Sequence, residues 1–166
     1  YLDNAATGTG AGTSWVNAFT NPTQLTASVL APGDTVWVSG GSSGKTYTNT
    51  LSAVESGTSA NPIRYRIGQE TNHNGQATFP AISFETFRYI TFDGARSPSF
   101  QPAASVFNLD RNAINMGFRT TRTNGLGVYA NGDGGVGNTL RWVEVGPHGS
   151  LDDIGSIDGI RLLNMN

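Results

Sequence analysis

The chain of 166 residues is long enough for one domain with a substantial core and too short for two full-sized domains. Its formal net charge of -2, with 10 Lys and Arg against 12 Asp and Glu, argues against nucleic acid or an anionic membrane as the main partner, because both require a concentrated basic surface. With 22 Gly, 13% charged residues and no cysteine, the composition is not that of a helical protein, and it excludes a disulfide framework and cysteine-based sites.

The sequence contains no stretch close to the ~20 apolar residues of a membrane span, so we expect no membrane insertion. The absence of cysteine fits either a bacterial exported protein or simply a stable fold, and a chain that begins at Tyr1 fits a mature product from which a signal peptide has been removed. We therefore expect a secreted or cell-surface location.

The first predicted element is a short amphipathic helix at residues 21–30. Asn21 is a favourable N-cap, Pro22 suits the first helical position, and Gln24 can complete a capping box. Its apolar face consists of Leu25, Val29 and Leu30. An Ala-Pro-Gly-Asp turn ends the helix, and a strand follows at 35–38. We expect the helix to cover one end of the strands that follow it.

Short strands with alternating apolar residues then recur at intervals of roughly 20 to 27 residues, separated by turns rich in Gly, Asn and Asp. The repeated units are 89–94, 113–118, 139–143 and 159–164. In each unit two apolar side chains flank an outward residue, as Ile90 and Phe92 flank Thr91. The repeat predicts a β-solenoid, whose interior holds one set of side chains. The predicted core residues are Val36, Val38, Ile63, Ile67, Ile82, Phe84, Ile90, Phe92, Val106, Leu109, Ile114, Met116, Leu140, Ile160 and Leu162.

An ordered series of segments along the chain carries a family resemblance. The segments are Tyr1-Leu-Asp-Asn, Gly12-Thr-Ser-Trp15, the helix at 21–30, Pro32-Gly-Asp-Thr-Val-Trp-Val38, Thr46-Tyr-Thr48, Gly57-Thr-Ser-Ala-Asn-Pro-Ile63 and Ile90-Thr-Phe-Asp-Gly94. The series resembles the N-terminal cap and first coils of secreted right-handed parallel β-helix proteins, the pectate-lyase-like superfamily. The resemblance implies export, three-sided coils and frequent association with polysaccharides, but fold membership alone does not assign one function.

We therefore expect an all-β fold, a right-handed parallel β-helix (β-solenoid) with a short N-terminal capping α-helix. Residues 1–62 form the cap and the first coil, and residues 63–166 form the remaining coils of one continuous domain. The sequence ends at Asn166, directly after a strand-like unit, and solenoid cores need terminal caps. Three explanations remain open: the chain is a fragment, loops fold back over the last coil, or head-to-tail self-association covers it and propagates as a filament.

The loop at 147–159 is the best candidate for chemistry, because it concentrates one His and three carboxylates. The candidate catalytic residues are His148, Asp152 and Asp153, as paired carboxylates can serve as acid and base in glycoside hydrolysis. The β-helical polygalacturonases carry an Asp-Asp pair, a Gly-His-Gly and an Arg-x-Lys. Here His148 precedes the Asp pair and Pro147 replaces the first Gly, so those assignments are not transferred. The alternative is that these side chains satisfy backbone groups of a turn.

Outward arginines form a second candidate site. The candidate glycan-binding residues are Arg64, Arg66, Arg141 and Arg161. Strands of neighbouring coils stack about 4.8 Å apart, so an arginine ladder can follow an anionic polysaccharide. The alternative is ordinary surface ion pairing with Asp93, Glu144 and Asp158. Five aromatic residues are expected at the surface, where they stack on sugar rings or pack in loops: Tyr47, Phe87, Tyr89, Phe100 and Tyr129.

Calcium is the one cofactor that the sequence suggests. Asp133 lies in an Asn-Gly-Asp-Gly turn and Asp158 lies in the acidic loop, and carboxylates with backbone carbonyls are suitable Ca²⁺ ligands. The alternative is that both residues belong to tight turns.

Three functions follow from these observations. The preferred one is an extracellular module that binds polysaccharide or surface glycan without a convincing catalytic set. The first alternative is a structural or adhesive subunit that self-associates through its open end. The second alternative is a polysaccharide lyase or glycoside hydrolase.

Overall fold

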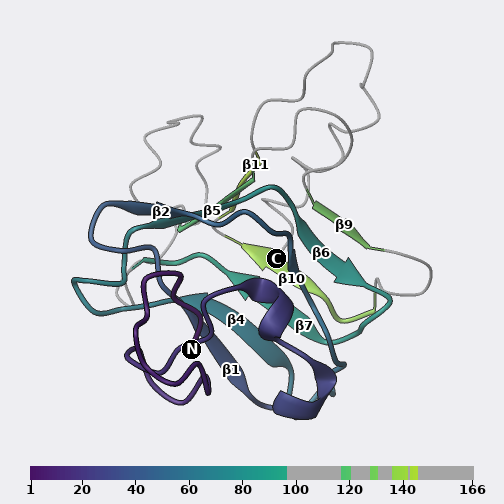
Figure 1. The fold of residues 1–166 in the computed structure, drawn as a ribbon. Helices are drawn as coiled ribbons and strands as arrows, with labels where there is room; N and C mark the ends of the chain where they lie inside the picture. Colours follow the sequence, from purple (N-terminus) through teal and green to yellow (C-terminus); the bar gives the residue numbers. More distant parts are fainter. Residues whose placement is uncertain (97–116, 121–127, 131–135, 142, 146–166) are drawn as a thin grey trace.

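The structure is a computed structural model that describes residues 1–96, 117–120, 128–130, 136–141 and 143–145. Most regular structure in these residues is parallel β-strand, arranged in three sheets (Figure 1). Sheet A contains β1 (Thr35–Val38), β4 (Ile63–Ile67), β7 (Ile90–Asp93) and β10 (Thr139–Arg141). Sheet B contains β2 (Gly44–Thr46), β5 (Gln76–Phe79), β8 (Phe118–Thr120) and β11 (Val143–Val145). Sheet C contains β3 (Leu51–Ser52), β6 (Ile82–Glu85) and β9 (Val128–Ala130).

Each sheet takes every third strand in chain order, and all of the pairings between neighbouring strands are parallel. The chain therefore visits sheets A, B and C in turn and then adds the next strand to each of them. Figure 1 shows β1, β4, β7 and β10 side by side as one such stack. This order is compatible with a solenoid and confirms the predicted strand at 35–38.

The core consists of side chains that alternate with outward ones along each strand. In sheet A one inward column runs through Val36, Tyr65, Phe92 and Leu140, which are all buried and in register. The Tyr65 and Phe92 rings stack with centroids 4.7 Å apart. Neighbouring strands thus place large apolar side chains directly above one another.

Every predicted core residue that lies in the described ranges is buried. These residues are Val36, Val38, Ile63, Ile67, Ile82, Phe84, Ile90, Phe92 and Leu140. The other predicted core residues lie outside the described residues: Val106, Leu109, Ile114, Met116, Ile160 and Leu162. The alternation of apolar residues therefore predicted correctly which side chains of the described strands are buried.

Glycines line the corner between sheets A and B, where successive passes of the backbone approach closely. The Gly40 amide donates to the His73 carbonyl at 2.8 Å, and the Gly75 amide donates to the Gly41 carbonyl at 2.7 Å. A Cβ on Gly40 would lie 1.8 Å from the carbonyl oxygen of Gly75. Glycine is required at this corner because a side chain would force the two passes apart.

The predicted α-helix at 21–30 is wrong: the segment contains two separate 3₁₀ helices, η1 (Pro22–Gln24) and η2 (Ala27–Val29). The start of the prediction is confirmed, because Asn21 caps η1 and the Gln24 side chain completes a capping box. Leu25 then adopts an extended backbone (φ -71°, ψ 122°) and is buried in the core. Thr26, Ser28 and Val29 have low helix propensities, so a continuous α-helix would gain little free energy here. Burying Leu25 in an extended conformation gains more.

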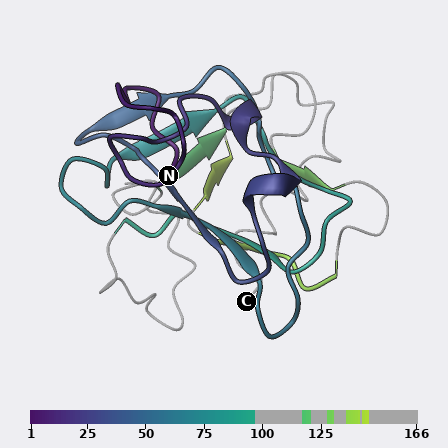
Figure 2. The ribbon, with the colours of Figure 1, turned by 60° about the horizontal axis from the view of Figure 1, so that its bottom comes forward.

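The N-terminal residues cover the free edge of β1. Leu2 lies between Val38 and Phe19 in parallel bridges, and it is fully buried. Its amide donates to the Trp37 carbonyl at 2.8 Å, and its carbonyl accepts from the Ser39 amide at 2.9 Å. In Figures 1 and 2 this purple segment and the two short helices lie together at the β1 side of the sheets. We call residues 1–20 the cap segment.

Candidate functional site

Two columns of outward side chains cross sheet A and form what we call the arginine face. The first column contains Trp37, Arg66, Asp93 and Arg141, and the second contains Thr35, Arg64, Thr91 and Thr139. Both columns follow from the register of β1, β4, β7 and β10, because residues two apart on a strand share a face. The strands thus collect residues that are more than 100 positions apart in sequence.

Asp93 lies at the centre of the first column. Arg141 Nη2 donates to Asp93 Oδ2 at 2.8 Å, and Arg66 Nε lies 3.2 Å from the same oxygen. The Arg66 contact is an ion pair, because its N–H is not directed at the carboxylate. The Asp93 side chain is 2% exposed, and its Oδ1 accepts from the Ala95 amide at 3.1 Å. One buried carboxylate therefore orients two guanidinium groups.

The face retains positive charge and an aromatic surface for a ligand. Arg141 is 46% exposed, and Arg64 is also exposed, with a hydrogen bond to the Pro62 carbonyl at 3.5 Å. Arg66 Cζ lies 5.3 Å from the ring centroid of Trp37, which is half-buried. Guanidinium groups can bind carboxylates or sulfates through paired hydrogen bonds, and aromatic rings provide a platform for sugar rings.

The structure brings together three of the four predicted glycan-binding arginines. Arg66 and Arg141 lie in one column on either side of Asp93, and Arg64 lies in the neighbouring column of the same face. Arg161 lies outside the described residues. The alternative given for these arginines, ion pairing with Asp93, is confirmed for Arg66 and Arg141. Trp37 was missed, although the alternation in its strand placed it on the outward side.

The predicted catalytic and metal residues lie outside the described residues: His148, Asp152, Asp153, Asp133 and Asp158. Within the described ranges there is no group of three or more His, Cys, Asp or Glu side chains placed to hold a metal ion. In those same ranges no helix has the length and apolar character needed to cross a membrane.

A second polar cluster, missed by the sequence analysis, lies where the cap segment meets the strands. We call it the cap cluster; its members are Asp3, Trp15, Ser39, Lys45 and His73. Lys45 occupies an inward position of β2, in register with buried Ala77, and its ammonium pairs with the Asp3 carboxylate. The Asp3 side chain is 7% exposed, so this ion pair closes the end of the core.

Burial and neighbouring charges shift the pKa values of the cap cluster and of the adjacent Tyr47. Burial opposes ionisation of Asp3, but the Lys45 ammonium and the Ala5 amide outweigh it, so the Asp3 pKa lies below its ordinary value. Burial lowers the pKa of His73, while Asp3 and Glu70 act in the opposite direction. Burial also raises the pKa of Tyr47, whose hydroxyl donates to the Ser39 carbonyl at 2.8 Å. Tyr47 is 2% exposed, so its predicted surface position is wrong.

Ser39, His73 and Asp3 are the residue types of a nucleophilic triad but do not have its geometry. Ser39 Oγ lies 2.9 Å from His73 Nδ1, and Asp3 Oδ2 lies 3.5 Å from that same nitrogen. A triad requires the serine and the carboxylate on opposite ring nitrogens. Ser39 is also fully buried, so a substrate cannot reach it. The cluster joins parts of the fold and is not a nucleophilic site.

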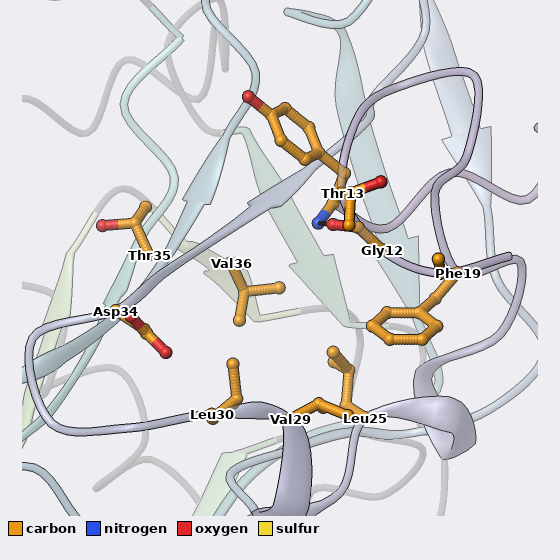
Figure 3. Close-up of a pocket in the computed structure, with 11 residues that line it drawn as sticks. Gly12, Thr13, Phe19, Leu25, Val29, Leu30, Asp34, Thr35 and Val36 are labelled. Atoms are coloured by element: carbon orange, nitrogen blue, oxygen red, sulfur yellow. Dashed lines mark hydrogen bonds between the residues drawn. The ribbon is translucent and has the colours of Figure 1, made fainter.

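A cavity of about 250 Å³ lies between the cap segment, the two 3₁₀ helices and β1 (Figure 3). Val36 and Leu30 point into it from opposite sides, and Phe19 and Leu25 form the wall nearest the cap segment. Asp34 lies at its rim, where its carboxylate accepts from the Ala31 amide at 2.8 Å. The pocket is open to solvent and mixes apolar side chains with polar groups such as Asp34 and Thr35, so it does not by itself indicate a ligand.

Comparison of the chain with protein-family models, curated proteins and solved structures gives no match. The resemblance to β-helix proteins stays a prediction from the sequence segments described above, and the order of the parallel strands is compatible with a solenoid.

Proposed function

We propose that the chain is a right-handed parallel β-helix, and that its arginine face binds an acidic polysaccharide outside the cell. The fold proposal is supported by the regular succession of sheets A, B and C and by the resemblance of the N-terminal segments. The handedness follows from a general rule, because connections between parallel strands of one sheet are nearly always right-handed.

The observation that carries the binding proposal is the position of Arg64, Arg66, Arg141 and Trp37 on one outward face. Neighbouring strands are about 4.8 Å apart, which is close to the advance of a polysaccharide per sugar ring. An extended glycan lying across the strands would therefore meet a new strand with each sugar. Arg64 and Arg66 on β4 and Arg141 on β10, two strands further along, would bind carboxylates of alternate sugars, while Trp37 on β1 would contact a ring face.

Binding is favoured over catalysis by the state of Asp93. This carboxylate is buried and contacts two arginines and the Ala95 amide, so it is not available to protonate or deprotonate a sugar. Glycoside hydrolysis commonly uses two carboxyl groups on either side of the scissile bond. We therefore assign Asp93 to the orientation of Arg66 and Arg141, and assign the face to recognition.

Electrophoresis through gels that contain polygalacturonate, alginate or neutral dextran tests the proposal. We expect the acidic polymers to retard the protein and dextran to have no effect. The double variant Arg64→Gln/Arg141→Gln should weaken binding by about 10- to 30-fold, corresponding to about 1 kcal/mol for each exposed arginine. Arg88→Gln is the matched control, because it removes the same charge from the turn between β6 and β7, outside both columns of the face.

Three outcomes would contradict the proposal. They are equal mobility in all gels, equal weakening by Arg88→Gln, and retention that the double variant leaves unchanged. Release of new reducing ends from the polymer by the wild-type protein would instead favour the lyase or hydrolase alternative. Loss of that release in Asp152→Ala or Asp153→Ala would assign the activity to the acidic loop.

A further inference from the structure

The charge of the arginine face alternates from one strand of sheet A to the next. Arg64 and Arg66 point outward from β4, and Arg141 points outward from β10. In both columns, the outward residues of β1 and β7 carry no positive charge. Positive side chains therefore lie on every second strand of the face.

The register turns this alternation into a regular spacing. Arg66 and Arg141 are both in register with Asp93, so exactly one strand, β7, separates β4 from β10. Neighbouring strands are about 4.8 Å apart, which places β4 and β10 about 9.6 Å apart. A glycan that advances by about one strand with each sugar would therefore meet positive charge at every second sugar.

The strand between the arginines is unfavourable for a carboxylate of the ligand. Asp93 lies at this level and contacts Arg141 Nη2 at 2.8 Å and Arg66 Nε at 3.2 Å. A ligand carboxylate above β7 would lie near this buried negative charge and would compete with it for the same two guanidinium groups. An uncharged sugar meets no such opposition.

The second column gives the same result at this level. Thr91 is the other outward residue of β7, and it is half-buried. Its hydroxyl can donate to or accept from a sugar hydroxyl, but it carries no charge to pair with a carboxylate. Whichever column a carboxylate on this sugar approached, it would therefore meet Asp93 or Thr91 and no cation of β7.

The β1 level repeats the uncharged environment of β7. Trp37 is half-buried and lies in the same column as Arg66, one strand before it. An indole ring favours contact with the face of an uncharged sugar over contact with a carboxylate. The levels from β1 to β10 thus run uncharged, positive, not positive and positive, which corresponds to two repeats of a two-sugar unit.

We propose that the arginine face selects polysaccharides that carry a carboxylate on every second sugar, with the uncharged sugars over β1 and β7 and the acidic sugars over β4 and β10. This inference rests on the proposed binding of acidic polysaccharide, and it adds the spacing of the charges that the face recognises.

Calorimetric titration with oligosaccharides of equal length tests the selection. The probes are hyaluronate, which has a uronate on every second sugar, polyglucuronate, which has one on every sugar, and hyaluronate whose carboxylates have been reduced to alcohols. At the same ionic strength, hyaluronate should bind at least about threefold more tightly than polyglucuronate, although it carries half the charge. Reduced hyaluronate should not bind. Attraction by charge alone would favour polyglucuronate.

A matched pair of variants locates the selection at β7. Thr91→Arg places a cation at the level that has none, so it should reduce the preference for hyaluronate by at least about threefold. Thr139→Arg makes the same substitution one strand further along the same column, at the level that already contains Arg141. It should strengthen the binding of both acidic ligands and leave their ratio unchanged. Both positions point outward and are half-buried, so the longer side chain can extend into solvent.

The outcomes separate this inference from the binding proposal. The alternation is overturned if polyglucuronate binds as tightly as hyaluronate or more tightly, or if Thr139→Arg changes the ratio as much as Thr91→Arg does. In those cases binding of acidic polysaccharide would still stand. If neither acidic ligand binds, or if reduced hyaluronate binds as well as hyaluronate, the binding proposal and the alternation both fail.

Discussion

Replacing Asp93 by asparagine removes the negative charge that lies between Arg66 and Arg141. The two arginine nitrogens lie 3.2 Å and 2.8 Å from the same carboxylate oxygen, and therefore within about 6 Å of each other. The asparagine keeps the shape of the side chain, and its Oδ1 can still accept from the Ala95 amide. The variant therefore isolates the charge from the packing.

The expected loss of stability follows from the burial of each partner. Breaking a fully buried ion pair costs about 3–5 kcal/mol, but the arginine side chains are 29% and 46% exposed, so solvent screens part of their repulsion. We expect Asp93→Asn to lower the free energy of unfolding by about 1–3 kcal/mol and Tm by about 2–10 °C. Arg141→Gln removes one exposed partner of the same carboxylate, and it should cost no more than about 1 kcal/mol.

Urea unfolding at low and high salt, followed by circular dichroism, provides the assay. Salt should narrow the gap between Asp93→Asn and the wild type, because it screens the repulsion between the two guanidinium groups. The double variant Asp93→Asn/Arg141→Gln should recover part of the loss for the same reason. The reasoning is refuted if Asp93→Asn is no less stable than Arg141→Gln, or if salt leaves the gap unchanged.

Three further predictions test the packing and the cap. Gly40→Ala should lower the free energy of unfolding by more than about 3 kcal/mol, because its Cβ would meet the Gly75 carbonyl. Gly44→Ala, whose Cβ would have its nearest contact at 3.6 Å, should change the free energy of unfolding by less than about 0.5 kcal/mol. Equal losses in thermal melts of the two variants would contradict the close backbone approach between Gly40 and Gly75. Tyr65→Phe should cost little, because the buried Tyr65 hydroxyl lies near the Val54 backbone but makes no hydrogen bond of good geometry. Tyr47→Phe should cost about 1 kcal/mol by losing its bond to the Ser39 carbonyl, and urea titrations that gave the opposite order would contradict this. Because the folded protein lowers the Asp3 pKa, the stability contributed by this carboxylate is present above pH 3.8 and is lost as the pH falls through the lowered value. Asp3→Asn should remove this part of the loss of stability in acid. An unchanged dependence of stability on pH below 3.8 in the variant would contradict the prediction.

The interior of the strands was predictable because it depends on local alternation. The segment around Ile90 alternates apolar and polar residues, and the inward Ile90 and Phe92 are buried; Val36 and Val38, two residues apart on β1, are buried in the same way. The same period places Arg66 and Arg141 outward, but that they share one face is known only from the register of β4, β7 and β10. The pattern does not give the order of strands within a sheet, which is why the position of Asp93 between the two arginines required the structure.

The cap was less predictable because long-range contacts determine it. The capping signals of Asn21 are local and are confirmed, but the burial of Leu25 converts the expected α-helix into two 3₁₀ helices. Lys45 follows a glycine-rich stretch with no local signal for burial, yet it occupies an inward position of β2 and pairs with Asp3, 42 residues away. Tyr47 is buried for a related reason, as its hydroxyl has a partner in the Ser39 carbonyl.

An NMR titration with a short oligouronate tests the central claim most directly, because it locates the ligand on the surface. The indole resonance of Trp37 and the guanidinium Nε resonances of Arg64 and Arg141 should shift saturably, and added salt should weaken the effect. The Trp15 indole lies in the cap cluster and should not shift. The binding claim is contradicted if these resonances do not shift, or if the Trp15 indole resonance shifts and that of Trp37 does not.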